Sequence, residues 1–368
     1  MIVKQIEKKS VVWFHDNNEY IVVEPLIAEI LSLLNNKVKK HEIVTNLIKN
    51  INIPQQEADN LVSDIEDLLK SNQNSSELEK NLHEPKSFAI QKFYQINNLV
   101  FKIDFLSDYE VSLVHPKFAH LAIEKPTTIN FHYKVFSDTN YITFSIDDTI
   151  IGTWKKNEVH YFQGKFSMKI VEHIHQKNEN EWMGVFHASA ISNSEESMLF
   201  LGDSGNGKST SLALLQANDF TCIADDFVPV DINKQEVFSF PSAISIKKNS
   251  LETLLPIYPE LENSAEYHFK KLNKIVRYLP PNNTDYTKHL PCKALVFIKY
   301  KKGSDLKIKE ISKINAFEQL VPDSWLSPIE KNAETFLNWF SNLPCYQLIY
   351  SDNQKMIATV HKIFNNEL

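Results

Sequence analysis

Glycine is scarce in this sequence. The chain has 368 residues and 7 glycines, whereas an average usage of roughly 7% would give about 26. A chain this poor in glycine is expected to keep it where the backbone needs a positive φ or a close approach to another group. Gly202, Gly205 and Gly207 lie within six residues of one another, so this short segment is the first candidate for a functional site.

Cysteine and long apolar runs are also scarce. The three cysteines, Cys222, Cys292 and Cys345, lie far apart and form no C-x-x-C pair. This argues against a disulfide scaffold and a cysteine-rich zinc site, and it fits a reducing compartment. The first residues contain no apolar signal-type segment, and no uncharged run of 18 residues occurs. We therefore expect a cytoplasmic protein with no membrane partner.

The sequence has no excess of basic residues either. Its 39 Lys and Arg face 46 Asp and Glu, which gives a net charge of −7, so the bulk charge does not predict a nucleic-acid partner. The hydrophobic content of 43% and the charged content of 23% are those of an ordinary globular protein. The length allows two or three domains of roughly 100–200 residues each.

Residues 1–72 are predicted to form a small winged-helix-like domain. Two short extended runs at 11–15 and 20–23 are joined by a polar turn, and apolar residues then recur at helical spacing in three segments. Pro54 stands where the first turn of the third helix would start. The polar stretch 73–87 is the best candidate for a linker to the next domain.

Residues 88–178 are predicted to be a β-rich portion of a larger catalytic region. Aromatic and β-branched residues predict strands at 99–105, 128–133, 141–146, 159–162 and 166–171. No Asp, Glu or Cys set accompanies the histidines of this portion, so we expect them to be solvated or hydrogen-bonded rather than metal ligands. These histidines are His115, His120, His132, His160, His173 and His175, of which the last two would share one face of a strand.

Residues 179–368 are predicted to form an α/β catalytic domain. From residue 182 the pattern changes to strand, glycine-rich loop, helix and strand. Further elements are then expected as a strand at 294–298, helices at 315–320 and 332–343, a short strand at 346–350 and a terminal helix at 354–364.

The glycine-rich segment matches the phosphate-binding pattern G-x-x-x-x-G-K-[ST]. An apolar strand at 198–201 precedes it and a helix over 209–217 follows it, which is the order that a P-loop needs. Loop N–H groups and Lys208 are expected to bind phosphate oxygens, and the Ser209 hydroxyl is expected to ligate Mg²⁺. The predicted nucleotide-binding residues are Gly202, Asp203, Ser204, Gly205, Asn206, Gly207, Lys208, Ser209 and Thr210.

Two carboxylates end the next predicted strand. Asp225 and Asp226 follow an apolar run one helix beyond the loop, where an acid that shares Mg²⁺ with Ser209 belongs, so both are candidate Mg²⁺ ligands. A second carboxylate there can accept a proton from an attacking hydroxyl. His187 lies in the apolar run 185–190, which is predicted to be the preceding strand, and spacing alone leaves open whether it is a core or a site residue.

The order of these motifs resembles that of HPr kinase/phosphorylase and its wider relatives, the HPr-kinase-like serine kinases, which have a P-loop fold of the PEP-carboxykinase type. In that family a histidine, a G-x-S-G-x-G-K-S loop and an A-D-D strand end follow one another. Here His187 lies 21 residues before Lys208, and Asp226 lies 18 residues after it. The resemblance implies ATP and Mg²⁺, with Asp226 as the base for a substrate hydroxyl and His187 and Lys208 at the phosphates. It also suggests a homo-oligomer.

The sequence departs from true HPr kinases after the acidic pair. The corresponding stretch 238–247 contains no acid, whereas those kinases carry a metal-binding glutamate there, and Glu236 and Glu252 flank the stretch without matching. This departure speaks against phosphorylase activity and against HPr as the substrate. A basic cluster follows, either as a solvated face or as a clamp on a transferred phosphate or an acidic substrate. Its members are Lys270, Lys271, Lys274 and Arg277.

Residues 1–72 are similar in topology to the PqqD-like peptide-recognition domains of peptide-modifying systems. Such domains bind a precursor's leader as an added β-strand, and an edge strand near 20–23 would serve here. The competing interpretation is a dimerisation or DNA-binding module, although the helix at 54–70 is acidic, which speaks against DNA.

The sequence thus predicts an ATP-dependent kinase that phosphorylates a serine or threonine hydroxyl, on a peptide held by the N-terminal domain. The alternatives are a kinase for a small-molecule hydroxyl and a regulatory protein that binds ATP and transfers nothing. The identity of the acceptor, the oligomeric state and the use of another phosphoryl donor stay open.

Overall fold

The computed structural model describes residues 1–71, 84–269 and 274–368. Its contacts divide the chain into two compact units. Unit 1 comprises Met1–Glu77 and Glu310–Cys345, and unit 2 comprises Leu78–Lys309 and Tyr346–Leu368. This division differs from the predicted boundaries, because a segment from the end of the predicted catalytic domain groups with the N-terminal residues. Most of the predicted linker 73–87 lies outside the described residues.

Unit 1 is built around a three-stranded antiparallel sheet. Strands β1 (Ile2–Ile6), β2 (Lys9–Phe14) and β3 (Glu19–Val23) pair in that order, so one strand precedes the two that the sequence predicts. The three predicted helices follow as α1 (Pro25–Asn35), α2 (Lys40–Ile51) and α3 (Gln55–Ser71).

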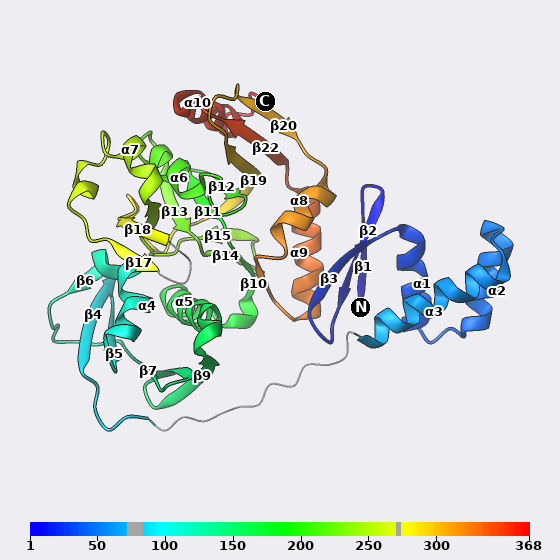
Figure 1. The fold of residues 1–368 in the computed structure, drawn as a ribbon, viewed down its shortest axis with the longest axis horizontal. Coiled ribbons are helices and arrows are strands. Elements are labelled where there is room, and N and C mark those ends of the chain that lie inside the picture. The colour runs from blue at the N-terminus through cyan, green and yellow to red at the C-terminus, as the bar shows by residue number, and fades with distance from the viewer. Residues whose placement is uncertain (72–83, 270–273) are drawn as a thin grey trace. The chain divides into compact units, whose positions relative to one another are not determined.

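Strand β2 is buried on both faces, which explains why four successive apolar residues end it. On one face, Val12 and Phe14 pack into the core made with α1, α2 and α3. On the other face, Tyr20 of β3 makes edge contacts with Phe317 and Phe336, at 6.0 and 5.6 Å between ring centroids. These two rings come from α8 (Lys313–Leu320) and α9 (Glu330–Asn342), drawn in orange beside the blue strands in Figure 1. Unit 1 also contains the short strand β21 (Trp325–Leu326).

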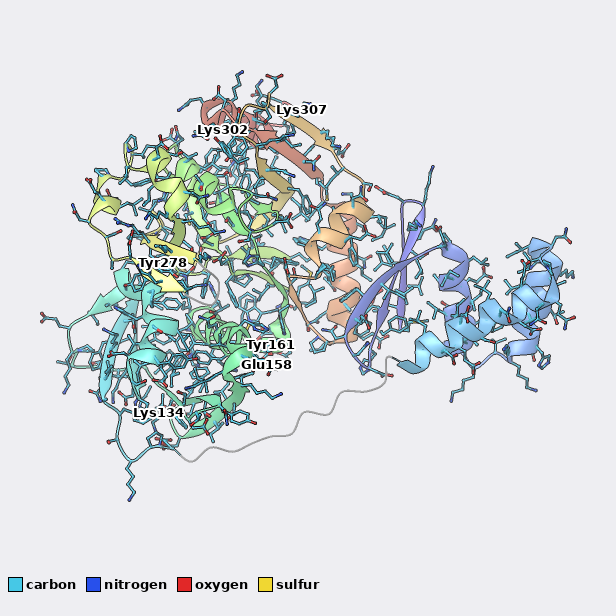
Figure 2. All side chains as sticks on the ribbon, in the orientation of Figure 1. Lys134, Glu158, Tyr161, Tyr278, Lys302 and Lys307 are labelled. Carbon is cyan, nitrogen blue, oxygen red and sulfur yellow. The ribbon has the colours of Figure 1, made fainter. Side chains whose placement is uncertain are left out.

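The first part of unit 2 is a six-stranded sheet in the order β6-β4-β5-β7-β8-β9. Helix α4 (Asp108–Phe118), which the sequence did not predict, begins at a capping box between Ser107 and Glu110. On β7, Lys134, which is labelled in Figure 2, forms ion pairs with Glu84 at 2.7 Å and with Asp148 at 3.1 Å. The strands are β4 (Ile90–Ile96), β5 (Leu99–Phe105), β6 (Ala122–Ile123), β7 (Phe131–Ser137), β8 (Tyr141–Ile146) and β9 (Thr149–Lys155).

The strands predicted at 159–162 and 166–171 are wrong, because both lie in one helix, α5 (Val159–His175). Its buried residues Phe162, Phe166, Ile170 and Ile174 recur every four positions, which places them on one helix face. The aromatic and β-branched content suggested strands, but the spacing of the buried side chains is helical. His173 and His175 therefore lie near the end of a helix, not on one face of a strand.

The second sheet of unit 2 follows the order β13-β11-β12-β19-β15-β14-β10, with β22 pairing with β19 and β20 pairing with β22. Helices α6 (Lys208–Gln216) and α10 (Asn353–Phe364) share one apolar core with its strands. The strands are β10 (Trp182–Phe186), β11 (Ser189–Ser192), β12 (Ser197–Leu201), β13 (Thr221–Asp225), β14 (Val228–Asp231), β15 (Glu236–Phe238), β19 (His289–Tyr300), β20 (Lys307–Glu310) and β22 (Cys345–Tyr350).

A third, small sheet has the order β16-β18-β17, and the short helix α7 (Leu251–Leu254) follows its first strand. The strands are β16 (Ile244–Lys247), β17 (Tyr267–Phe269) and β18 (Lys274–Leu279). In the part of the chain that the structure describes, no helix combines the length and apolarity that a bilayer crossing requires.

Candidate phosphate-binding site

The predicted P-loop joins the buried strand β12 to helix α6. Gly207 precedes the helix with a φ of 97°, and Gly202 has a φ of 136°, values at which a side chain is strained. A Cβ atom added at Gly202 would lie 2.8 Å from the carbonyl oxygen of Ile298 on β19. These glycines are therefore fixed by the backbone conformation and by the neighbouring strand.

Lys208 lies inside the curl of this loop. Only 7% of the residue is exposed, and its Nζ donates a hydrogen bond to the carbonyl oxygen of Gly202. The first turn of α6 is held by two hydroxyl contacts of 2.8 Å, from Ser211 to Tyr350 and from Thr210 to Ser250. Lys208 therefore lies at the N-terminus of α6, where the helix dipole stabilises a bound anion.

A single cleft collects most of the predicted residues. The loop contributes Asp203, Ser204, Gly205, Gly207, Lys208, Ser209 and Thr210 to its lining. Gly202 and Asn206 do not line it; the Asn206 carbonyl accepts a hydrogen bond from the Tyr300 N–H at 2.9 Å. Other elements supply His187, Asp226, Ser245, Lys247, Asn249, Ser250 and Lys274.

Asp225 is the last residue of β13 and is buried, with 2% exposed. Its carboxylate accepts hydrogen bonds from the Ser189 hydroxyl at 2.6 Å, from the Ser209 hydroxyl at 3.0 Å and from the Ser245 N–H at 3.1 Å. Burial and then the charge of Asp226 raise the pKa of Asp225 to about 6, against the effect of these hydrogen bonds. The structure places this acid beside Ser209, as the sequence spacing predicts.

Asp226 has a different environment. Its φ of 63° is in the left-handed region, which turns the chain away from the strand direction, and its side chain lines the cleft. Lys117 Nζ lies 3.9 Å from its Oδ2. Burial acts to raise the pKa of this carboxyl, but the surrounding positive charges, with Lys117 first, hold it below its ordinary value. Asp226 is therefore an ionised carboxylate that faces the open cleft.

His187 also lines the cleft. The predicted single strand over 185–190 is interrupted at this residue, because β10 ends at Phe186 and β11 begins at Ser189. The exposed His187 lies in the bend between them, where a backbone hydrogen bond of 2.9 Å joins the Ala188 N–H to the Phe186 carbonyl. The bend explains how a histidine within an apolar run reaches the site.

The Ser209 hydroxyl, which lines the cleft, and the adjacent buried Asp225 carboxylate fit Mg²⁺ shared with a phosphate. The Ser209 hydroxyl and an Asp225 oxygen lie 3.0 Å apart, and Mg²⁺ prefers one or two protein oxygens completed by water and phosphate oxygens. Within residues 1–71, 84–269 and 274–368, no group of three or more His, Cys, Asp or Glu side chains could hold a metal ion. With these two protein oxygens, a magnesium ion here would take its remaining ligands from water and phosphate oxygens.

Two lysines of the site were not singled out from the sequence. Lys117 comes from α4, whose existence was not predicted. Lys247 ends β16, and its Nζ donates a 2.8 Å hydrogen bond to the Ser204 hydroxyl. One feature of the sequence could have pointed to Lys247: it is the last residue of the acid-free stretch 238–247.

The two described members of the predicted basic cluster have different environments. Lys274 lines the cleft, whereas Arg277 forms an ion pair with Glu266 at 3.0 Å and donates to the carbonyls of Leu261 and Glu262. Lys270 and Lys271 lie outside the described residues.

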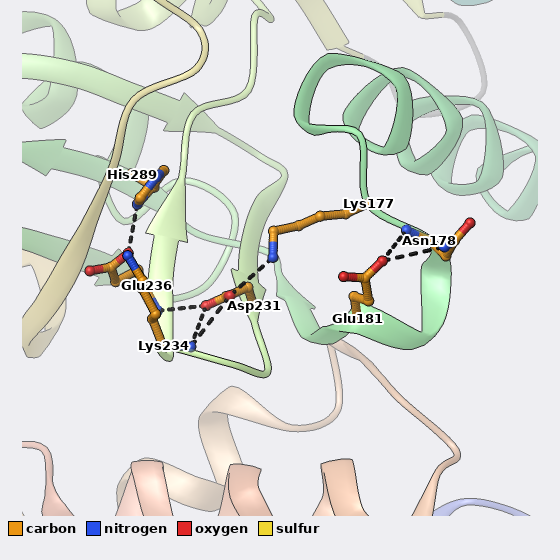
Figure 3. A network of polar contacts seen from close by, with 7 residues as sticks. All are labelled: Lys177, Asn178, Glu181, Asp231, Lys234, Glu236 and His289. Atoms are coloured by element: carbon orange, nitrogen blue, oxygen red, sulfur yellow. Dashed lines mark hydrogen bonds and ion pairs between the residues drawn. The ribbon is translucent and has the colours of Figure 1, made fainter.

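The flanking Glu236 belongs to a polar network on β14 and β15, shown in Figure 3. It accepts a hydrogen bond of 2.6 Å from His289 Nδ1. The neighbouring Asp231 is 1% exposed and accepts from Lys177 Nζ at 3.2 Å and from the Lys234 and Glu236 N–H groups. These contacts hold the turn between β14 and β15, so the network has a structural role.

A scan against protein-family models finds no match for this chain, and a search of curated proteins finds no relative.

Proposed function

We propose that this chain is an ATP-dependent kinase with an HPr-kinase-like P-loop fold, which transfers the γ-phosphoryl group of ATP to a serine or threonine hydroxyl. The observation that carries the proposal is one cleft lined by Lys208, Ser209, Asp226 and His187. Phosphoryl transfer needs donors for the phosphates and a carboxylate for the attacking hydroxyl, and this cleft offers both.

Each side chain then has a role that its contacts suit. Lys208 leaves the Gly202 carbonyl and donates to β- and γ-phosphate oxygens, together with the loop N–H groups. The acceptor oxygen attacks the γ-phosphorus while its proton passes to Asp226, and the bond to the β-phosphate oxygen breaks as ADP leaves. His187 donates to a phosphate oxygen. Held by Ser209 and Asp225, Mg²⁺ would neutralise charge on the β- and γ-phosphates.

The direct test is transfer of label from γ-labelled ATP in the presence of Mg²⁺. The full chain is incubated with a library of peptides containing serine or threonine, and separately with small hydroxyl compounds. Label on peptide that is lost in both Lys208→Ala and Asp226→Asn supports the proposal. Label only on small molecules supports the small-molecule kinase, and ATP binding without transfer to either class supports a regulatory protein.

We further propose that unit 1 is a winged-helix-like, PqqD-like domain that holds the acceptor peptide as a strand added to β3. Two features of unit 1 support this. In the described residues, β3 is paired on one side, with β2, and each of its residues is at least partly exposed. An edge strand of this kind can pair with an extended peptide.

Hydrogen exchange of the full chain tests this peptide site. Addition of an acceptor peptide is expected to slow exchange in residues 19–23, because peptide pairing occupies their N–H groups. Strand β1 is the matched control, since it forms the other edge of the same sheet. Equal protection of both edges, or of neither, contradicts this site.

A further inference from the structure

The phosphate site has more positive charge than its P-loop lysine supplies. Lys247 and Lys274, from the neighbouring strands β16 and β18, line the same cleft as Lys208. The acids that line it are Asp203 and Asp226. The extra lysines therefore face a region where a nucleotide would bring several negative charges.

Lys247 is held next to the P-loop by its contact with Ser204. Its Nζ donates to the Ser204 hydroxyl at 2.8 Å, and Ser204 is the third residue of the loop, ahead of the lysine that serves the β- and γ-phosphates. Burial, followed by the charges of Lys274 and Lys208, lowers the pKa of Lys247, and the charge of Asp226 acts on it in the opposite direction. Lys247 thus interacts with the P-loop lysine and with the proposed base.

Lys247 lines the same cleft as the two groups that would flank a transferred phosphoryl group. The transferred group must lie between Lys208, which binds the β- and γ-phosphates, and Asp226, which accepts the hydroxyl proton. Lys247 is electrostatically coupled to both. The Ser204 hydroxyl is a neutral acceptor, whereas a phosphate oxygen is a stronger, charged acceptor. When a nucleotide binds, Lys247 would therefore donate to a phosphate oxygen in place of the Ser204 hydroxyl.

We propose that Lys247, assisted by Lys274, binds the non-bridging oxygens of the transferred phosphoryl group and so supplies positive charge there. This inference rests on the proposed kinase function. It predicts that the cleft binds a nucleoside triphosphate more tightly than a nucleoside diphosphate. In the transfer step a bond forms between the acceptor oxygen and the γ-phosphorus. The bond from that phosphorus to the β-phosphate oxygen breaks, and its electron pair stays on ADP. The acceptor proton goes to Asp226, and Lys247 keeps its own protons throughout.

Calorimetric titration of the full chain with Mg-ATP and with Mg-ADP tests the inference without reference to turnover. Lys247→Met is expected to lower ATP affinity by about tenfold or more, because a charge-assisted hydrogen bond contributes roughly 1.5–3 kcal/mol. ADP affinity is expected to change by less than about threefold, since ADP has no γ-phosphate for the lysine to contact. Lys248→Met is the matched control: it removes the adjacent lysine, which is exposed and does not line the cleft, and both affinities should stay at the wild-type value.

Lys247→Arg keeps the positive charge and is expected to retain the preference for ATP, so the inference can be judged even if the methionine variant folds poorly. Equal losses for ATP and ADP in Lys247→Met, or no loss for either, would overturn the role of Lys247 while leaving nucleotide binding intact. Loss of the ATP preference in Lys247→Arg would overturn it as well. Wild-type protein that binds neither nucleotide would contradict the proposed function itself.

Discussion

The phosphate cleft and the six-stranded sheet of unit 2 both contain polar side chains among apolar ones, but their polar groups are partnered differently. Next to the sheet, His173 of α5 stacks on Phe131 of β7 with ring centroids 3.8 Å apart and hydrogen bonds the Tyr133 hydroxyl at 2.7 Å. His132 is 2.6 Å from an Asp104 oxygen. These partners lie within the protein, so the histidines complete local packing.

In the cleft, by contrast, the charged groups have longer or uncharged partners. Asp226 faces Lys117 at 3.9 Å, and Lys247 contacts a neutral hydroxyl. Charged groups with weak partners on an open surface can take a charged ligand at little cost in lost contacts. The comparison indicates that the partner set of a polar side chain, more than its burial, distinguishes a binding site from a structural network.

Substitution of Asp226 should have a far larger effect on activity than substitution of an ordinary surface acid. Asp226→Asn is expected to lower phosphoryl transfer by about 10²–10⁴-fold, the usual range for loss of a general base, and to leave ATP affinity within about threefold because phosphate contacts remain. Asp219→Asn is the matched control, since Asp219 also has a left-handed φ, of 67°, and is exposed. Equal activities of the two variants would contradict the role of Asp226.

Acid should destabilise unit 2 through protonation of His175. Burial lowers the pKa of His175 to about 4, and its Nε2 bonds the Ser239 carbonyl at 2.9 Å. The folded state therefore favours the neutral ring. Its contribution to stability is complete above the unfolded pKa of about 6.5 and is lost as the pH falls toward 4, by up to about 3 kcal/mol.

Urea unfolding at pH 7.5 and pH 5 measures this loss. His175→Gln is expected to reduce the difference in unfolding free energy between the two pH values. His15→Gln, at an exposed histidine, is expected to leave that difference unchanged. A wild-type protein that is equally stable at both pH values disagrees with this account.

The P-loop backbone should tolerate a methyl group poorly at Gly202. Gly202→Ala places a Cβ 2.8 Å from the Ile298 carbonyl at a φ of 136°, so we expect a loss of about 1–3 kcal/mol in unfolding free energy and weaker ATP binding. Gly303→Ala has a φ of 74° with open space around the added carbon. It should cost about 1 kcal/mol and leave ATP affinity unchanged. Similar ATP affinities in both variants would show that the loop geometry does not matter for binding.

Two buried serines on β11 allow a further comparison. Ser189→Ala removes the 2.6 Å hydrogen bond to buried Asp225 and is expected to cost about 1–3 kcal/mol in unfolding free energy at pH 7.5. Ser192→Ala is the matched control, because Ser192 is equally buried and, among the described residues, its hydroxyl has no hydrogen-bond partner. Urea unfolding should therefore separate the two, and equal losses would argue against support of Asp225 by Ser189.

The local elements of the site could be predicted from the sequence because their requirements are local. A strand, a glycine-rich turn and a helix in a fixed order define the loop, and the structure confirms β12 and α6 at those places. The acids at 225 and 226 follow from the end of an apolar strand, which is confirmed as β13. The kinase activity and the family resemblance remain predictions.

The remaining features depend on tertiary packing that a sequence pattern does not contain. Lys117 reaches Asp226 because α4 packs next to the acidic strand end, where the Ala243 N–H bonds the Lys117 carbonyl at 2.8 Å. The association of Glu310–Cys345 with the N-terminal residues rests on ring contacts such as that of Tyr20 with Phe336. Helix α5 was misassigned because aromatic residues suit strands and helices alike, and the partner surface selects the spacing.

Each of these proposals requires that the cleft between β12, α6 and β13 binds a nucleoside triphosphate. Titration of the full chain with Mg-ATP, for the wild type and for Lys208→Ala, measures this binding. We expect saturable one-site binding by the wild type and a loss of at least about tenfold in affinity for the variant, because Lys208 would donate to the phosphates. Equal affinities in the two proteins, or no binding by the wild type, would show that the cleft is not a nucleotide site.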